Sequence, residues 1–346
     1  IWDGDVGPRA AAALQASSLA QAVLIPGSDD AAMWLADHAH TALAERFPVS
    51  SSSRETLEIF QDKARFGEFL ANTGVPHPRT LSLRERADVD RIPFGDGDRY
   101  FLKPTDSQAF SQALGAKGVW AHSREEFRTA WERLAAQGFQ VVAQEYVPGT
   151  SADHFFVDGF RDRHGNLPGL FARRRERIFP ADFGNSSYCR SIALPDVAAA
   201  VADLGRLLAA TNYRGIFSAE FKRDARTGAF RLLEVNTRAW WYVEFAARCG
   251  VNVCRMAHED ALGILDGPVP AGNLRGERQK KLIQAFPGAE IPHQLRPPLD
   301  EEDFSRTDPA DRRENRPGAE PARALHFLDP DRPGKTPPAD RAGAFR

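Results

Sequence analysis

The sequence predicts a mixed α/β protein with two or three domains. Its 346 residues are enough for more than one buried core, and 42% of them are hydrophobic while 27% are charged, as in ordinary globular proteins. Short apolar segments of strand length alternate along the chain with amphipathic segments of helical length. We therefore expect helices and strands to be interleaved through most of the chain.

Residues 1–58 are expected to form a small Rossmann-like α/β domain. The composition predicts helices over 10–22 and 29–47, with a strand over 22–25 between them. The loop PGSDD (26–30) could bind an anion, but we favour a helix cap by Ser28 or Asp29. Because the chain opens on Ile1 rather than Met, we expect the first strand of this domain to be truncated.

The region 59–265 is expected to contain both helices and strands. Helices are predicted where a capping residue opens an amphipathic stretch, as Ser123 does with Glu126 three residues later. These helices cover 56–72, 123–137, 195–210 and 242–249. Strands are predicted where apolar runs end at turn residues, at 99–104, 139–146, 152–160 and 169–177, with a hairpin formed by 217–222 and 231–238.

The composition also excludes several classes of function. The net charge of −2 gives no electrostatic case for nucleic acid or for an anionic membrane, and no apolar run approaches the roughly 20 residues that span a bilayer. The three cysteines form no metal-spaced pair, so a reducing cytoplasm is the expected location. The segment 266–346 is rich in Pro, Arg and Asp and is expected to be a largely disordered extension.

The hairpin carries the strongest chemical signal. In the segment RLLEVNTR (231–238), Glu234, Asn236 and Arg238 alternate, so they share one face of a strand. The segment FSAEFK (217–222) adds Glu220 on the neighbouring strand, and the link RDARTG (223–228) is turn-rich. Carboxylate and amide oxygens suit a hard cation, and a guanidinium suits phosphate. The alternative is an ordinary solvent-exposed strand face.

Three further segments point to an anion-binding cleft. Lys103 ends an apolar strand, although taken alone we favour a surface lysine, and the small polar loop 105–118 follows it. In RRRER (173–177), alternate arginines share a face that binds anions or faces solvent. Trp240 and Trp241 would line a pocket or pack in the core.

Taken in order along the chain, these segments resemble the ATP-grasp superfamily of carboxylate–amine ligases. The resemblance lies in DK (62–63), FLKP (101–104), QEYVPG (144–149), EFK (220–222) and LEVNTR (233–238), within about residues 20–265. Three phrases, QDKARF (61–66), KPTDSQAFS (103–111) and residues 173–184, are most similar to the amino-acid ligase branch that includes D-aspartate ligase. The resemblance implies an ATP-grasp domain over 59–265, with two α+β subdomains around ATP and a lid subdomain over about 98–147.

The resemblance also implies roles for individual residues. Contacts to ATP fall on Lys63, Lys103, Ser107, Glu145, Tyr146, Val147 and Asp153. Ligands for one or two Mg²⁺ ions, with Mn²⁺ as an alternative, are Glu220, Glu234 and Asn236. Arg238, Arg175 and Arg177 are implied to act on the transferring phosphoryl group and the substrate carboxylate.

These roles predict an ADP-forming ligase. It would join a small-molecule carboxylate to an amine, with an amino acid or small peptide as one partner, through an acyl phosphate. A homodimer is the assembly considered, with neither nucleic acid nor membrane as a partner. The alternatives are a carboxylase or carbamoyl-type enzyme that uses bicarbonate, and a non-catalytic ATP-binding module.

Overall fold

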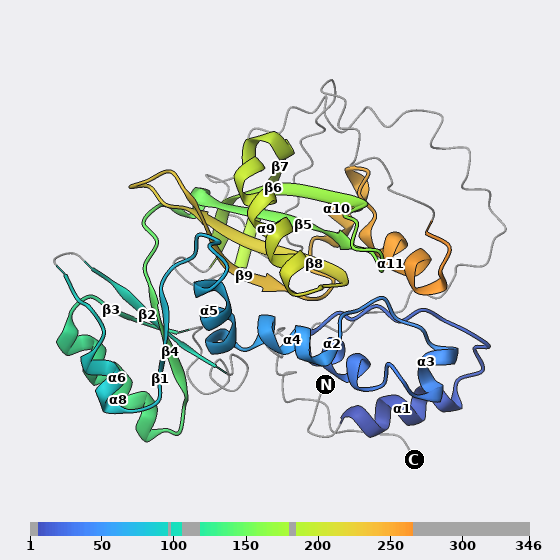
Figure 1. Ribbon diagram of the computed structural model, residues 1–346, viewed down its shortest axis with the longest axis horizontal. Helices are drawn as coiled ribbons and strands as arrows, with labels where there is room; N and C mark the ends of the chain where they lie inside the picture. Colours follow the sequence, from blue (N-terminus) through green and yellow to red (C-terminus); the bar gives the residue numbers. More distant parts are fainter. Residues whose placement is uncertain (1–5, 96–97, 106–117, 180–184, 266–346) are drawn as a thin grey trace, which may run out of the picture. The chain divides into compact units, whose positions relative to one another are not determined.

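The computed structural model describes residues 6–95, 98–105, 118–179 and 185–265 (Figure 1). The chain divides into two compact units, and helix α1 (Val6–Ala16) is the described part of the first unit. The second unit begins at Ser17 and contains all the other described elements. Ser107 and the predicted disordered extension over 266–346 lie outside the described residues.

A four-stranded antiparallel sheet forms the smaller of the two sheets. Its strands are β1 (Thr80–Leu83), β2 (Tyr100–Pro104), β3 (Val119–Ala121) and β4 (Val141–Glu145), in the order β1-β4-β2-β3. Helices α6 (Arg86–Asp90) and α8 (Arg124–Ala136) share one apolar cluster with this sheet, in which Leu102, Phe127 and Leu134 are fully buried. The predicted helix over 123–137 is confirmed, with Ser123 as its N-cap.

A five-stranded antiparallel sheet forms the larger body. Its strands are β5 (His154–Arg161), β6 (Gly169–Phe179), β7 (Asn185–Ile192), β8 (Gly215–Arg223) and β9 (Phe230–Asn236), in the order β7-β6-β5-β8-β9. Short 3₁₀ turns η1 (Ser151–Asp153) and η2 (Leu194–Val197) precede β5 and helix α9 (Ala198–Ala210). The predicted hairpin of 217–222 and 231–238 is therefore confirmed as β8 and β9.

One face of this sheet carries the main hydrophobic core. Because side chains alternate along a strand, Phe217, Ala219 and Phe221 of β8 all point to the same side, where they are fully buried. Helices α4 (Arg54–Gln61), α5 (Lys63–Ala71) and α9 supply the opposing apolar side chains of this cluster. The intervening residues of β8, among them Glu220, consequently project from the other face.

Part of that other face is covered near one end of the strands. Helices α10 (Val243–Arg248) and α11 (Val253–Leu262) pack there in a cluster with Phe160, Phe171 and Ile216. The polar residues farther along β5, β6 and β8 lie beyond this cluster on the same face. The polar stretch of this face thus begins where the cluster of α10 and α11 ends.

Two predicted helices are each divided in the structure. The predicted helix over 56–72 is wrong at Asp62, which has extended backbone and accepts hydrogen bonds from the amides of Ala64 and Arg65, so it ends α4 and caps α5. The predicted helix over 29–47 becomes α2 (Asp29–Asp37) and α3 (Ala42–Arg46). The N-cap of α2 is Ser28, whose hydroxyl accepts from the amide of Ala31 at 3.1 Å.

The predicted strand over 22–25 forms a single parallel bridge. Leu24 pairs with Val49, and the amide of Leu24 donates to the carbonyl of Pro48 at 3.0 Å. A parallel bridge followed by a helix at Ser28 is compatible with the Rossmann-like arrangement expected for this region. That domain assignment stays a prediction.

The β8–β9 hairpin also contacts the four-stranded sheet. The amide of Leu232 donates to the carbonyl of Pro76 at 2.8 Å, and the amide of Ala225 donates to that of Pro148 at 3.0 Å. The Glu145 carboxylate at the end of β4 lies 3.5 Å from a guanidinium nitrogen of Arg226 and 3.5 Å from one of Arg231. The strand pair that carries the candidate metal ligands is thus tied directly to β4.

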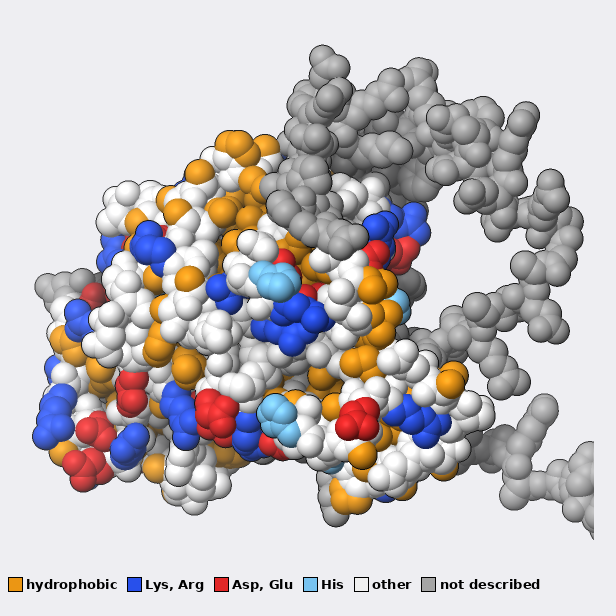
Figure 2. Space-filling view, turned by 45° about the vertical axis from the view of Figure 1, so that its right-hand side comes forward, with side chains coloured by type: hydrophobic (Ala, Val, Ile, Leu, Met, Phe, Trp, Pro, Cys, Tyr) orange, Lys and Arg blue, Asp and Glu red, His pale blue; other side chains and the backbone are white. Residues whose placement is uncertain are grey.

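Charges of both signs are interspersed among the coloured side chains of the face shown in Figure 2. In the described ranges, none of the helices combines the length and the apolar character needed to cross a membrane.

Candidate active site

The candidate site lies on the polar face of the five-stranded sheet. Strand register places Glu220 of β8 opposite Glu234 of β9, and Ser218 opposite Asn236. The register shifts directly after Glu220, because Leu233 is an extra residue in β9. This bulge lets Leu232 and Val235 both reach the hydrophobic core while Glu234 and Asn236 share the face of Glu220.

Two side chains bind the carboxylate of Glu220 on this face. Its Oε1 accepts a hydrogen bond from His154 Nδ1 at 2.6 Å and lies 3.1 Å from a terminal nitrogen of Arg175. Burial alone would raise the pKa of Glu220, but Arg175, His154 and Lys103 together hold it well below its ordinary value. Glu220 therefore carries a full negative charge at neutral pH.

His154 has the opposite tendency. Its side chain is 15% exposed, and burial lowers its pKa, although Glu220 favours the protonated ring. Arg175 and Lys222, which are positively charged neighbours, also lower the pKa of His154. A neutral imidazole that donates its Nδ1 proton to Glu220 satisfies these charges.

Arg175 is held from several sides. Its side chain is 7% exposed, its Nε donates to Ser186 Oγ at 2.7 Å, and its guanidinium carbon lies 5.2 Å from the centre of the Phe156 ring. The structure thus brings Arg175 directly to Glu220. Arg177 lies past a register shift in β6, with its guanidinium 5.8 Å from the Tyr188 ring.

A buried ion pair supports this row of charges. Arg173 Nε lies 2.7 Å from Asp158 Oδ2, and Ser218 donates to Asp158 Oδ1 at 2.7 Å. Both charged side chains are almost completely inaccessible to solvent. Arg173 therefore stabilises the interior of the sheet, whereas Arg175, on the same face, reaches the candidate site.

The three residues predicted to bind a metal have suitable donor atoms but do not enclose a metal ion by themselves. Glu234 is exposed, and Asn236 Nδ2 lies 3.4 Å from Glu234 Oε1. Among the described residues there is no ready-made group of three or more His, Cys, Asp or Glu side chains that would enclose a metal ion. Two carboxylates and an amide on one face nevertheless fit Mg²⁺, which usually keeps phosphate oxygens and water among its ligands.

The lysines reach the site from different elements. Lys103, on β2 of the other sheet, contributes to the low pKa of Glu220, so the two sheets place opposite charges near each other. Lys222 lies on the same face of β8 as Glu220, with its Nζ 4.8 Å from the Tyr146 ring, and its pKa is lowered chiefly by burial. Lys63 is the first residue of α5, and its contact with ATP phosphates stays a prediction.

The predicted adenine and ribose contacts lie where β4 leads into β5. The Glu145 carboxylate accepts from the amide of Arg79 at 3.2 Å, the Tyr146 ring lies 5.3 Å from Trp120, and Val147 is buried. Asp153 accepts from the amide and hydroxyl of Thr150 and pairs with a neighbouring arginine at 3.1 Å. In this structure, Asp153 thus has a capping role, and its contact with ribose stays a prediction.

Arg238 follows β9 and contacts a residue that lies 209 positions earlier in the chain. Its Nε lies 3.2 Å from Asp29 Oδ1, on the first residue of α2. Glu234 also acts electrostatically on Asp29. Arg238, Glu234 and Asp29 therefore form a second charged group beside Glu220.

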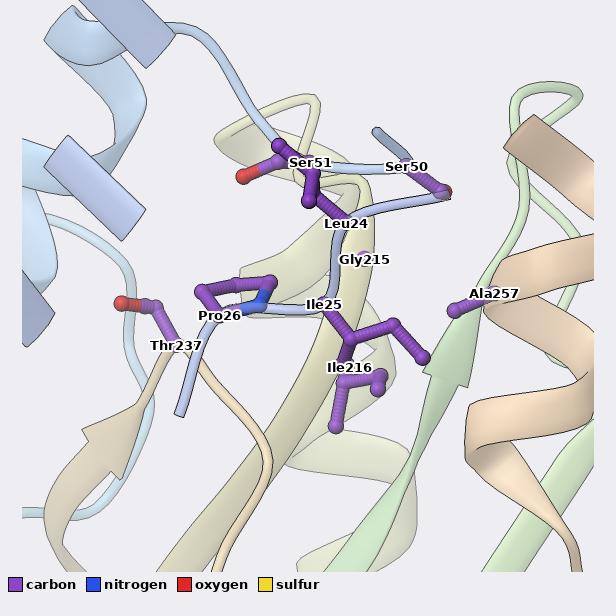
Figure 3. Close-up of a pocket in the computed structure, with 9 residues that line it drawn as sticks. All are labelled: Leu24, Ile25, Pro26, Ser50, Ser51, Gly215, Ile216, Thr237 and Ala257. Atoms are coloured by element: carbon purple, nitrogen blue, oxygen red, sulfur yellow. The ribbon is translucent and has the colours of Figure 1, made fainter. Parts of the chain in front are cut away.

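A narrow recess lies next to this group and lacks charged side chains (Figure 3). The residues that line it come from the N-terminal segment, β8, α11 and the end of β9: Leu24, Ile25, Pro26, Ser50, Ser51, Gly215, Ile216, Thr237 and Ala257. Trp240, predicted to line a pocket or pack, is 6% exposed in the hydrophobic cluster of α10 and α11, whereas Trp241 is 46% exposed. The recess offers shape and hydroxyl groups but no charge for a phosphate.

Three residues of the site escaped the sequence analysis as functional candidates. His154 was not singled out, Lys222 was noted only as part of a motif, and Asp29, on α2, was noted only as an alternative cap. The alternation of charged residues along 152–160 and 217–222 could have placed His154 and Lys222 on the face of Glu220. No local signal identifies Asp29, because its partner Arg238 lies 209 residues away.

Known proteins resemble this chain in sequence and in fold. No protein-family profile matches it. A D-aspartate ligase from Enterococcus faecium (strain Aus0004) is 25% identical over 251 residues, which cover 69% of this chain and 58% of that ligase. The chain thus spans less than two thirds of the length of this relative.

Two solved structures of enzymes have a fold similar to that of this chain. The biotin carboxylase–β,γ-ATP complex from Campylobacter jejuni matches with a TM-score of 0.59 and 16% identity, over 74% of this chain and 57% of that one. The L-amino acid ligase from Bacillus licheniformis matches with a TM-score of 0.50 and 15% identity, over 67% of this chain and 54% of that one.

Proposed function

The chain has the ATP-grasp fold, and from this premise we propose that it is an ATP- and Mg²⁺-dependent ligase that joins a carboxylate to an amine. The observation that carries the proposal is the row of charges on the polar sheet face. Arg175 and His154 hold Glu220 ionised, and Glu234 lies directly opposite it in the strand register. ATP recognition alone would not require two opposed carboxylates with arginines on both sides.

Phosphoryl transfer needs positioned charges more than covalent participation by the protein. In the proposed site, Lys103 and Lys63 neutralise phosphate oxygens, and Arg238 holds the phosphoryl group during transfer. Arg175 and Arg177 bind the substrate carboxylate and its phosphorylated form. Mg²⁺ held by Glu220, Glu234 and Asn236, or Mn²⁺ in its place, would supply charge neutralisation between the phosphates.

We place the nucleotide base along Glu145, Tyr146 and Val147, and the ribose near Asp153. The small polar loop 105–118, which contains Ser107, would cover the phosphates. A substrate carboxylate then attacks the γ-phosphate to give an acyl phosphate and ADP, and an amine displaces phosphate to form the amide. Because an acyl phosphate hydrolyses readily, the reaction requires a site from which water is excluded.

Small molecules are the proposed substrates, with an amino acid or small peptide as one of them. The likeness to a D-aspartate ligase supports this choice. A second candidate is a bicarbonate-using enzyme, which the fold similarity to a biotin carboxylase favours. The two candidates differ in the acid that ATP activates and therefore in the compound that stimulates ADP release.

The test is a screen of the purified full chain with Mg-ATP. ADP and phosphate release would be measured against separate pools of amino acids, small peptides and bicarbonate. Stimulation by an amino acid or peptide, with formation of an amide product by mass spectrometry, supports the ligase. Stimulation by bicarbonate alone supports the second candidate, and nucleotide binding without stimulation by any pool contradicts both.

Replacing Glu234 by Gln tests the proposed metal ligand. The amide retains the size of the side chain but removes the negative charge, so we expect turnover to fall by at least about 100-fold while ATP still binds weakly. Glu244→Gln is the matched control, because Glu244 lies on α10 and pairs only at the surface with Arg248. Unchanged turnover in Glu234→Gln would remove Glu234 from the metal site.

A further inference from the structure

The N-terminal segment 26–29 is fastened to the residues around Arg238. The amide of Ala239 donates to the carbonyl of Pro26 at 3.1 Å. The side chain of Gln61 bridges the same two segments, since its Nε2 lies 3.2 Å from the carbonyl oxygen of Asp29 and 3.3 Å from the hydroxyl of Thr237. The backbone on both sides of Arg238 is therefore tied to the start of α2.

The guanidinium of Arg238 is itself fixed at two points. Its Nε donates to Asp29 Oδ1 at 3.2 Å, and its Nη1 donates to the carbonyl of Ala239 at 3.3 Å. Because a guanidinium is planar, two bonds from different nitrogens determine the orientation of the whole group. Ser28 already caps α2, so the Asp29 carboxylate is available for Arg238.

We propose that Asp29 is a positioning residue, which orients Arg238 towards the terminal phosphate of a bound nucleoside triphosphate. This inference rests on the proposed function, in which Arg238 contacts the transferring group. Arg238 is 20% exposed and Asp29 is 44% exposed, so a ligand can reach the guanidinium. The N-terminal region thereby contributes a residue to phosphoryl transfer that no motif of the chain predicts.

The charges around Asp29 support this role. Partial burial raises the pKa of Asp29, Glu234 and Asp30 act in the same direction, and Arg238 opposes them. Asp29 thus lies near two further acidic side chains and accepts the hydrogen bond of Arg238. An ordinary surface ion pair would contribute little to stability and would not affect which nucleotide binds. The experiment therefore measures the effect of Asp29 on the preference between two nucleotides.

The experiment compares the binding of two nucleotides by calorimetry. The full chain would be titrated with Mg-ADP and with the Mg complex of a non-hydrolysable ATP analogue that has a β,γ-imido bridge. We expect the unmodified protein to prefer the analogue, and Asp29→Asn to reduce this preference about tenfold, which corresponds to one charge-assisted hydrogen bond. Asp30→Asn is the matched control, since it removes the same charge from the next residue.

A double-mutant cycle separates positioning from independent binding. We expect Arg238→Ala to lose the same preference, and Asp29→Asn to cause no further loss in the Arg238→Ala background. Asp29→Glu retains the charge and is expected to keep more of the preference than Asp29→Asn. Thermal unfolding of every variant provides the check that each one is folded.

The outcomes distinguish this inference from the function on which it rests. Failure of the unmodified protein to bind either nucleotide would overturn both. Normal binding together with an unchanged preference in both Asp29→Asn and Asp29→Glu overturns only the role of Asp29. Additive losses in the double variant also overturn it, because they mean that Asp29 and Arg238 act separately.

Discussion

Replacing Asp260 by Asn tests whether one buried carboxylate holds four segments of the chain together. Asp260 lies on α11 and is 1% exposed. Its Oδ2 accepts from Ser50 Oγ at 2.6 Å and from Arg214 Nε and Nη2 at 2.9 and 2.6 Å. Its Oδ1 accepts from the amide and Nε of Arg163, both at 3.1 Å.

The magnitude follows from these five donors. If the NH₂ group of the new Asn takes the place of Oδ1, it faces two donors, and if it takes the place of Oδ2, it faces three. In either orientation at least two donors therefore lose their acceptor. A buried donor without a partner costs about 1–3 kcal/mol, and the low end applies because Arg163 and Arg214 are 35% and 31% exposed. We expect a loss of about 2 kcal/mol, or a midpoint lower by about 4–8 °C.

The assay is thermal unfolding by calorimetry, supported by urea titration. Glu259→Gln is the matched control, because Glu259 is the preceding residue of α11 and its partner Arg255 is 70% exposed. This control should stay within about 0.5 kcal/mol of the unmodified protein. A melting point for Asp260→Asn within about 2 °C of the unmodified protein would refute the reasoning.

The other predictions concern pH, backbone and the buried ion pair. Burial alone would raise the pKa of Asp260, but its hydrogen bonds and arginine partners hold it below the ordinary 3.8. The contribution of Asp260 to stability is therefore complete above pH 3.8 and is lost as the pH falls further. In urea titrations below pH 3.8, the free energy of unfolding should fall more steeply with decreasing pH for the unmodified protein than for Asp260→Asn. Gly149→Ala should cost about 1–3 kcal/mol in thermal unfolding, since Gly149 has φ +139° and an added Cβ would lie 3.0 Å from a carboxylate oxygen. Gly205→Ala, inside α9, should instead stabilise the protein by about 0.5–1 kcal/mol in the same assay. Arg173→Met should cost about 3–5 kcal/mol in urea unfolding, because it removes the cationic partner of the buried Asp158 and leaves that carboxylate with the hydrogen bond from Ser218. Adding Asp158→Asn should recover part of that loss, and no recovery would contradict this account.

The sequence predicted the β8–β9 hairpin well because its signal is local. Polar and apolar residues alternate in both strands, and the link between them contains the turn residues Asp224 and Gly228. The strand β7 was missed because its sequence, NSSYCRSI, has no apolar run and forms an edge of the sheet. Only its pairing with β6 reveals it.

The site was predictable in part for the same reason. Glu220, Glu234 and Asn236 could be placed together because they belong to one hairpin. The bulge at Leu233 and the bonds from His154 and Arg175 to Glu220 depend on how separate strands pair, which no local pattern encodes. The break at Asp62 was missed because the amphipathic pattern continues through it, so the pattern alone outweighed the capping tendency of Asp.

The order of strands in the larger sheet has a consequence for folding. Strands β5, β6 and β7 follow one another as a meander, and β8 and β9 form a hairpin, so both groups can form from local contacts. Among the described strands, the pairing of β5 with β8 joins these two groups, and it brings together His154 and Glu220, which are 66 residues apart. Such non-local pairing is the slow step in sheet formation, because the intervening loop must close first. The charged row on the polar face is therefore completed at the same step that unites the two halves of the sheet, and a chain stalled before that step carries the hairpin acids without their partners.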